Sequence, residues 1–137
     1  MFTYIETSII FAMEDKNSHN QTKRFTTVLT EEVMNFVQKQ ENKAREKILF
    51  NIRKAETNLD PEIFKKLTED IWEFRTLWKR THYRLLAFWD KYEEVMVIVT
   101  HGFIKKTDKT PIKEIERARI IRDKYLTDKI SKKNEII

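Results

Sequence analysis

The pattern of polar and apolar residues predicts four strands: the first two alternate, the third is almost wholly apolar and the fourth is β-branched and apolar. They are residues 24–30, 70–78, 83–89 and 94–101. The last three follow one another closely, and the links between them, residues 79–82 and 90–93, are of hairpin length. We therefore expect an antiparallel meander of three strands, preceded at some distance by a fourth strand.

Apolar residues spaced three and four apart predict helices between the first strand and the meander. Thr30, followed by Glu31 and Glu32, begins the first helix, because a hydroxyl accepts an unpaired N–H and carboxylates complement the positive end of a helix. The apolar stripe changes phase around residues 38–42. This region is therefore expected to form two helices, or one broken helix, arranged as a hairpin.

Both prolines mark helix boundaries. Pro61 ends the hairpin, and a short helical turn is expected over residues 63–67. Thr110 and Pro111 are expected at the N-cap and the first position of a last helix, where proline's missing N–H is not needed. The predicted element order is β-α-α-β-β-β-α.

This order predicts an α+β fold with helices on one face of a small, mainly antiparallel sheet and the other face less covered. With 137 residues, the chain is long enough for one domain. A polar spacer, residues 14–23, makes residues 1–22 an expected N-terminal extension. Residues 23–127 are expected to form the domain, and residues 128–137 a C-terminal tail that frays.

Charge and composition narrow the function only slightly. There are 27 Lys and Arg and 22 Asp and Glu, giving a net charge of +5, which permits a polyanionic partner such as RNA but is common among ordinary proteins. The lack of Cys excludes disulfides and thiolate chemistry and fits a cytoplasmic location. The first residues have neither the pattern of a signal peptide nor the length of a membrane span, so no membrane partner is expected.

Histidine and glycine are too few for several common sites. The histidines at 19, 82 and 101 form no helical pair, and one Gly cannot make a phosphate-binding loop, so no metal or cofactor is expected. The single glycine, Gly102, is expected to let the fourth strand turn out of the sheet, at positive φ or at a bulge. This turn would place the lysines that follow it beside the other cations. The alternative is that Gly102 simply ends a strand before a helix.

Basic residues recur on the predicted strands and at their ends. Because side chains alternate, Glu73 and Arg75 are expected on the open face of the sheet, opposite Trp72 and Phe74. If the strand registers cooperate, cations from three strands converge on one phosphate-sized patch. The candidates are Arg75, Arg84, His101, Lys105 and Lys106, with Trp78 at the rim.

Each of these candidates can also be explained by an ordinary structural role that involves no substrate. Arg75 and Glu73 can form an ordinary surface ion pair. Residues 78–80 can be a solvated hairpin instead of a base-stacking platform. His101 can be a hydrogen-bonded residue at a strand end, and the lysines of residues 105–109 can be a solubilising loop.

Four motifs in order resemble one family of proteins. The residues are Trp72, Glu73 and Arg75; Tyr83 and Arg84; His101, Gly102, Phe103, Lys105 and Lys106; and Lys109 and Pro111. With these motifs and spacings, residues 23–126 resemble the RelE/HigB-type toxins of bacterial toxin–antitoxin systems, most closely the phage-related HigB-like branch. The resemblance implies a RelE-like fold with a helical hairpin and a C-terminal helix.

It also implies a function. Such toxins cleave mRNA, typically on the translating ribosome, without a metal, as the ribose 2′-hydroxyl attacks the adjacent phosphate. They are held inactive by a cognate antitoxin, here expected to be a HigA-like helix-turn-helix protein. The protein must align nucleotides, neutralise developing charge and move two protons.

The implied roles follow residue chemistry. Arg75 and Arg84 are expected to grip phosphates, because the planar guanidinium binds two oxygens at once. Lys105 and Lys106 are candidates for neutralising transition-state charge, a desolvated Lys for proton transfer, and His101 for acid or base work. Further substrate-binding candidates are Glu73, Trp78, Lys79, Arg80 and Lys109.

Two other functions stay open for this fold. One is a toxin that blocks a protein target such as DNA gyrase without cleaving RNA, and the other is a non-catalytic RNA-binding phage accessory protein. Glu73 stands near where the RelE enzymes have a basic residue, so its carboxylate would orient Arg75 or act as a base.

Overall fold

The computed structural model describes residues 4–6, 22–92 and 95–136, with side chains for 22–92 and 95–132. The predicted extension, residues 1–22, therefore lies mostly outside the described residues. What is described of it includes a short strand, β1 (Tyr4–Glu6), which pairs antiparallel with β2 (Thr26–Thr30).

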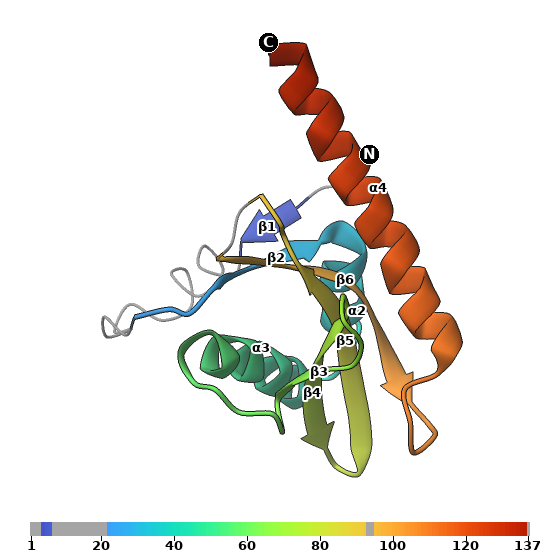
Figure 1. Ribbon diagram of the computed structural model, residues 1–137. Helices are drawn as coiled ribbons and strands as arrows, with labels where there is room; N and C mark the ends of the chain where they lie inside the picture. Colours follow the sequence, from blue (N-terminus) through green and yellow to red (C-terminus); the bar gives the residue numbers. More distant parts are fainter. Residues whose placement is uncertain (1–3, 7–21, 93–94, 137) are drawn as a thin grey trace.

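A six-stranded sheet with helices on both faces forms the described part of the chain (Figure 1). After β1 and β2 come α2 (Glu31–Gln38), α3 (Asn42–Thr57), β3 (Phe64–Lys66), β4 (Trp72–Trp78), β5 (Thr81–Trp89), β6 (Met96–Lys105) and α4 (Ile112–Ile136). The strand order is β1-β2-β6-β5-β4-β3, and neighbouring strands are antiparallel except β2 and β6. The α+β class, the helical hairpin and the three-strand meander are confirmed.

Three local expectations need correction. Residues 64–66 form the edge strand β3 and not a helical turn, because Phe64 pairs and stacks with Phe74 of β4. Helix α4 begins at Ile112, one residue later than predicted, and the Thr110 hydroxyl donates to Glu73 instead of capping the helix. Residues 128–136, where the sequence suggests fraying, continue α4.

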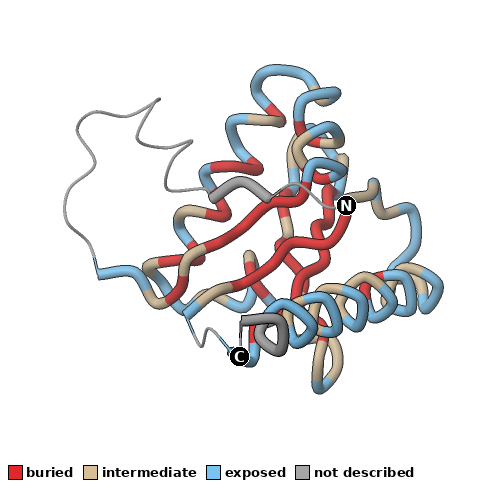
Figure 2. The backbone as a smooth tube through the Cα atoms, turned by 90° about the horizontal axis from the view of Figure 1, so that it is seen from above, coloured by how far each residue is buried: buried red, intermediate tan, exposed pale blue. Residues whose placement is uncertain are grey.

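The sheet separates two hydrophobic cores, as Figure 2 shows with the buried strands between layers of helix. Helices α2 and α3 cover one face, whose core includes Phe25, Phe64 and Phe74. The expected helical hairpin on one face is confirmed, but the last helix, α4, lies on the other face. On the second face the strands present Leu86, Phe88 and Ile98, and α4 covers them with Ile115, Ala118 and Tyr125. A strand buried on both faces reads as a nearly continuous apolar run, which is the pattern of β5.

Asp90 fixes α4 to the end of β5. The buried carboxylate accepts hydrogen bonds from the Tyr125 hydroxyl and the Lys129 ammonium, each 2.6 Å long, and from the Tyr92 backbone N–H. Burial raises the pKa of Asp90, but the bonds from Lys129, Tyr125 and Tyr92 together outweigh it and hold the pKa below its usual value. The carboxylate is therefore charged in the folded protein, and α4 is held over the second face.

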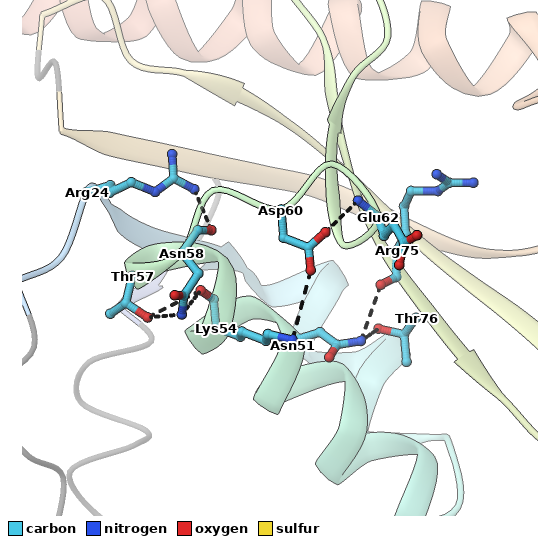
Figure 3. A network of polar contacts seen from close by, with 9 residues as sticks. All are labelled: Arg24, Asn51, Lys54, Thr57, Asn58, Asp60, Glu62, Arg75 and Thr76. Atoms are coloured by element: carbon cyan, nitrogen blue, oxygen red, sulfur yellow. Dashed lines mark hydrogen bonds and ion pairs between the residues drawn. The ribbon is translucent and has the colours of Figure 1, made fainter.

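A polar network attaches α3 and the following loop to β4 (Figure 3). The Asn51 amide donates to the Thr76 hydroxyl at 3.1 Å and to the Arg75 carbonyl at 3.3 Å. Asp60 accepts from the Glu62 backbone N–H and pairs with Lys54. These contacts hold residues 60–63 beside β4, and β3 begins at the next residue, Phe64.

A bulge in β6 decides which side chains reach the second face. Leu86 of β5 lies opposite His101, but the next residue, Ala87, lies opposite Val99, so Thr100 is the extra residue. Its hydroxyl donates to the Leu86 carbonyl at 3.1 Å, and its carbonyl accepts from the Thr30 hydroxyl at 3.2 Å. Because an extra residue reverses the alternation, every side chain of β6 after the bulge changes face.

Gly102 serves close packing and not a turn. The strand β6 continues through it to Lys105, Gly102 pairs with Leu85, and its φ is not positive, so the predicted turn at this residue is wrong. A Cβ atom at this position would lie 2.4 Å from a ring carbon of Phe36 and 2.7 Å from a methyl of Leu85. The missing side chain therefore lets the Phe36 ring of α2 pack directly on the sheet.

Candidate active site

Three neighbouring strands bring cations together on the face that α4 partly covers. In the β4–β5 register Arg75 lies directly opposite Arg84, and in the β5–β6 register His82 lies opposite Lys105. Lys105 reaches this face only because the bulge at Thr100 reverses the alternation of β6. The structure thus brings Arg75, Arg84 and Lys105 together, and adds His82, which the sequence analysis did not select.

Glu73 balances these cations. Its carboxylate is 3.3 Å from Nε of Arg84 and 3.7 Å from Nε of Arg75, and it accepts a hydrogen bond from the Thr110 hydroxyl. Its side chain is 2% exposed, so the predicted open face is not open at this residue. A carboxylate between two guanidinium groups offsets the repulsion that like charges opposite one another cause. The Thr110 contact also joins the segment after β6 to β4.

Arg84 is almost completely buried and is paired with the buried Glu73 carboxylate. Its side chain is 3% exposed, and one terminal nitrogen donates to the Tyr83 carbonyl. Its buried Nε is ion-paired with the Glu73 carboxylate but makes no hydrogen bond among the described residues. Burial lowers the pKa of Arg84, Glu73 raises it, and Arg75 lowers it, yet a guanidinium stays charged at neutral pH. A guanidinium that stays charged and lines a groove is suited to binding an anion.

Lys105 holds its proton less tightly than an ordinary lysine. Burial and then Arg84 lower its pKa, Glu73 opposes them, and Arg75 adds to the lowering. The side chain is only partly buried, so its ammonium can reach a bound molecule. Among the predicted catalytic residues, Lys105 is accessible to a bound molecule and gives up its proton more readily than an ordinary lysine.

A groove of about 450 Å³ opens beside the cations. Its lining residues are Lys47, Asn51, Glu62, Ile63, Arg75, Thr76, Leu77, His82 and Arg84. It runs along the part of β4 that extends past the end of β3, which pairs only with residues 72–74. The groove is therefore cationic at Arg75 and Arg84, and its lining is of mixed polarity toward the tip of the β4–β5 hairpin, where Leu77 lies opposite His82.

His101 lies on the same face but is sealed inside the protein. Its ring is fully buried, its Nδ1 is 3.0 Å from the Thr100 hydroxyl, and it stacks on Phe103. Burial and Arg117 lower the pKa of His101 to about 4, so its ring is neutral at pH 7. The Glu114 carboxylate 3.5 Å from Nε2 is therefore not an ion-pair partner at that pH. In this position His101 stabilises the bulge through its contact with the Thr100 hydroxyl.

The tip of the β4–β5 hairpin carries the predicted aromatic and basic rim. Trp78 donates from Nε1 to Glu41 at 2.8 Å, and the ammonium groups of Lys47 and Lys79 lie 5.5 and 5.7 Å from the centre of its ring. The ring therefore already has cationic neighbours. Lys79 and Arg80 both have positive φ, 46° and 66°, in a two-residue turn where Asn and Gly are preferred.

The remaining predicted lysines lie outside the cluster. Lys106 and Lys109 are exposed in the segment between β6 and α4, where the Thr107 hydroxyl donates to the Lys109 carbonyl. Among described residues, no group of three or more His, Asp or Glu is placed to hold a metal ion.

One family model matches this chain. The family model of the phage-derived protein Gp49-like (DUF891) matches residues 35–123, well over half of the chain. The chain belongs to the Gp49-like family. Gp49-like proteins are part of the RelE/HigB-like toxin group, which the four motifs resemble. No curated protein matches this Gp49-like chain. In the described part of the chain, no helix has the length and apolarity needed to cross a membrane.

Proposed function

We propose that this Gp49-like protein is a toxin that cleaves mRNA on the translating ribosome. The observation that carries the proposal is the grouping of Arg75, Arg84 and Lys105 on one face of the sheet, with both arginines lining a groove. This arrangement suits a phosphodiester, whose oxygens need several donors at once. Membership of the RelE/HigB-like group supports the same reaction.

In the proposed reaction, the 2′-hydroxyl oxygen of one nucleotide attacks the adjacent phosphorus and the bond to the 5′-oxygen of the next nucleotide breaks. The products are a 2′,3′-cyclic phosphate and a free 5′-hydroxyl. Arg75 and Arg84 bind the two non-bridging oxygens, where negative charge increases in the transition state. Glu73 keeps the two guanidinium groups in place beneath the phosphate.

Two protons must move, and two groups face the groove or the cation cluster. His82 lines the groove, and imidazole is the side chain best suited to accept a proton near neutral pH, so we assign it the proton of the 2′-hydroxyl. Lys105, whose pKa is lowered, is assigned the proton given to the leaving 5′-oxygen. This differs from the sequence-based assignment to His101, which is buried and neutral and acts here as a positioning residue for the bulge.

A cognate antitoxin is part of the proposal. The resemblance points to a HigA-like helix-turn-helix protein, and an acidic segment of such a partner would complement the groove's cations. Co-expression of the toxin with its neighbouring gene product should restore growth, and the purified pair should not cleave mRNA. A pair that forms no complex would remove this part of the proposal.

Primer extension on a defined mRNA in a reconstituted translation system tests the enzymatic claim. Wild type should create new ends only when ribosomes are present, and Arg84→Ala should reduce the cleavage rate by about 100-fold or more, the usual cost of losing one preorganised donor. Arg119→Ala, which removes an exposed arginine of α4, is the matched control and should cleave normally. Arrested growth with intact mRNA would overturn the claim and favour a toxin that blocks a protein target.

A further inference from the structure

The groove is larger than its cationic end requires. At about 450 Å³ it has the size of a small-molecule site, which typically spans about 300 to 1,000 Å³. A phosphate held by Arg75 and Arg84 occupies one end only. The other end, nearer the tip of the β4–β5 hairpin, includes Leu77 and His82, which lie opposite each other. The lining along the outer edge of β4 also includes Lys47, Glu62, Asn51 and Ile63.

The backbone of β4 supplies hydrogen-bonding groups to that end. The Arg75 N–H donates to the Ile63 carbonyl at 2.8 Å, so residue 75 directs its backbone groups toward the outer edge of β4. Because this direction repeats every second residue, the N–H and carbonyl of Leu77 face the same edge. Strand β3 does not extend to Leu77, since it pairs only with residues 72–74. One donor and one acceptor therefore lie side by side along the groove.

The side chains around this edge have matching chemistry. Ile63 and Leu77 provide apolar surface, and Leu77 is 51% exposed. Lys47 adds a donor and Glu62 an acceptor, and a carboxylate at this end disfavours a second phosphate there. The site therefore suits a flat, uncharged group with both donors and acceptors on its edge, attached to the phosphate held by Arg75 and Arg84.

We propose that this end of the groove is a nucleobase subsite, in which the Leu77 backbone and the Glu62 and Lys47 side chains read the edge of one RNA base. The inference rests on the proposed function, because it places the base next to the phosphate that Arg75 and Arg84 bind. A peptide strand added to the same edge is less suitable, since the edge beyond β3 is short and strand addition relies on a row of backbone bonds. The cations at the groove also favour a nucleotide over a neutral peptide.

Nuclear magnetic resonance titrations of the full chain separate the two ends of the groove. Inorganic phosphate should shift the Arg84 Nε–H signal and leave the Leu77 amide unchanged. The four nucleoside monophosphates should shift both signals, and the best of them should bind about tenfold more tightly than phosphate, as expected for two added hydrogen bonds. Nucleotides that shift Arg84 alone would overturn the subsite but leave the phosphate site intact.

Two variants test the edge directly. Leu77→Pro removes the proposed N–H donor at an edge position where proline is tolerated, and Leu77→Ala keeps that donor and serves as its control. Leu77→Pro should lose the tenfold advantage of nucleotide over phosphate, whereas Leu77→Ala should keep most of it. Glu62→Gln, an exposed substitution, should change the order of preference among the four nucleotides by about threefold or more without changing phosphate affinity.

The outcomes distinguish this subsite from the function on which it rests. Unchanged preferences in both Leu77→Pro and Glu62→Gln would overturn the subsite. If Leu77→Pro fails to fold, Glu62→Gln alone decides the matter. If neither phosphate nor any nucleotide shifts the Arg84 signal, the phosphate site itself is wrong, and both the subsite and the proposed function fail.

Discussion

Replacing His101 with glutamine should remove a large part of the dependence of stability on pH. The folded protein holds the pKa of His101 at about 4, because of burial and Arg117, whereas an unfolded histidine has a pKa near 6.5. Between these values the unfolded chain binds a proton that the folded chain does not. The stability contributed by neutral His101 is therefore fully present above pH 6.5 and is lost as the pH falls toward 4.

The size of the effect follows from the two pKa values. Lowering the pH from 8 to 5 should cost about 2 kcal/mol, and the limiting cost at lower pH is about 3 kcal/mol. Asp90, whose pKa is lowered, loses its contribution only as the pH falls below the usual range for Asp, so it changes little above pH 5. The window from pH 8 to pH 5 therefore isolates the histidine.

Urea unfolding at pH 8 and pH 5 measures this difference. His101→Gln should be less stable than wild type at pH 8 but should lose about 2 kcal/mol less between the two pH values. Val99→Ala is the matched control, because it removes buried atoms beside the bulge without removing a titratable group, so it should lose as much stability between pH 8 and pH 5 as wild type does. If His101→Gln and wild type lose equal stability, His101 is not held neutral by burial, and its assignment as a support behind the bulge would be wrong.

Three further predictions concern the backbone and the charge balance. Arg80→Gly should raise stability by about 1 kcal/mol, visible as a higher Tm, because glycine accepts the positive φ of 66° without strain; an unchanged Tm would show that the turn relaxes. Gly102→Ala should destabilise by about 1 to 3 kcal/mol through contact with the Phe36 ring, and adding Phe36→Leu should recover part of the loss in urea unfolding; equal losses in single and double variants would contradict this. Glu73→Gln should destabilise the protein by about 3 to 5 kcal/mol, because Arg84 would then be a buried charge without its partner. A thermal melt that gives a stability within about 1 kcal/mol of wild type would contradict the claim that Glu73 balances the charge of Arg84.

The regular part of the fold could be predicted because its signals are local. The Thr30 cap, the phase change near residues 38–42 and the close spacing of the last strands are all visible in the sequence, and the structure confirms the elements that they indicate. The edge strand β3 could not be separated from a helical turn, since a three-residue strand shows no period. Its pairing with β4 depends on the stacking of Phe64 against Phe74, a contact between distant residues.

The candidate site was only partly predictable, because one extra residue changes which face a side chain occupies. Arg75 and Arg84 follow from alternation along their strands, and the structure places them opposite each other. Lys105 shares their face only because Thr100 is bulged, and no residue type in the sequence marks that bulge. His82 had a usable signal, since it lies two residues before Arg84 on the same strand and therefore faces the same side.

Gly102 shows why a rare residue can be noticed and still be misinterpreted. Its uniqueness correctly indicated a position that excludes a side chain, but positive φ and close packing both produce that requirement. The deciding neighbour, Phe36, lies on a helix far away in the sequence. Only the packing of α2 on β6 identifies the reason.

The most direct test of the central claim uses an mRNA with a single 2′-deoxy nucleotide at the position that the wild-type protein cleaves. The proposed reaction needs that hydroxyl as nucleophile, so cleavage at this position should stop while cleavage of the unmodified message leaves a 2′,3′-cyclic phosphate and a 5′-hydroxyl. Cleavage of the deoxy message at the normal rate, or ends carrying a 5′-phosphate, would contradict the account.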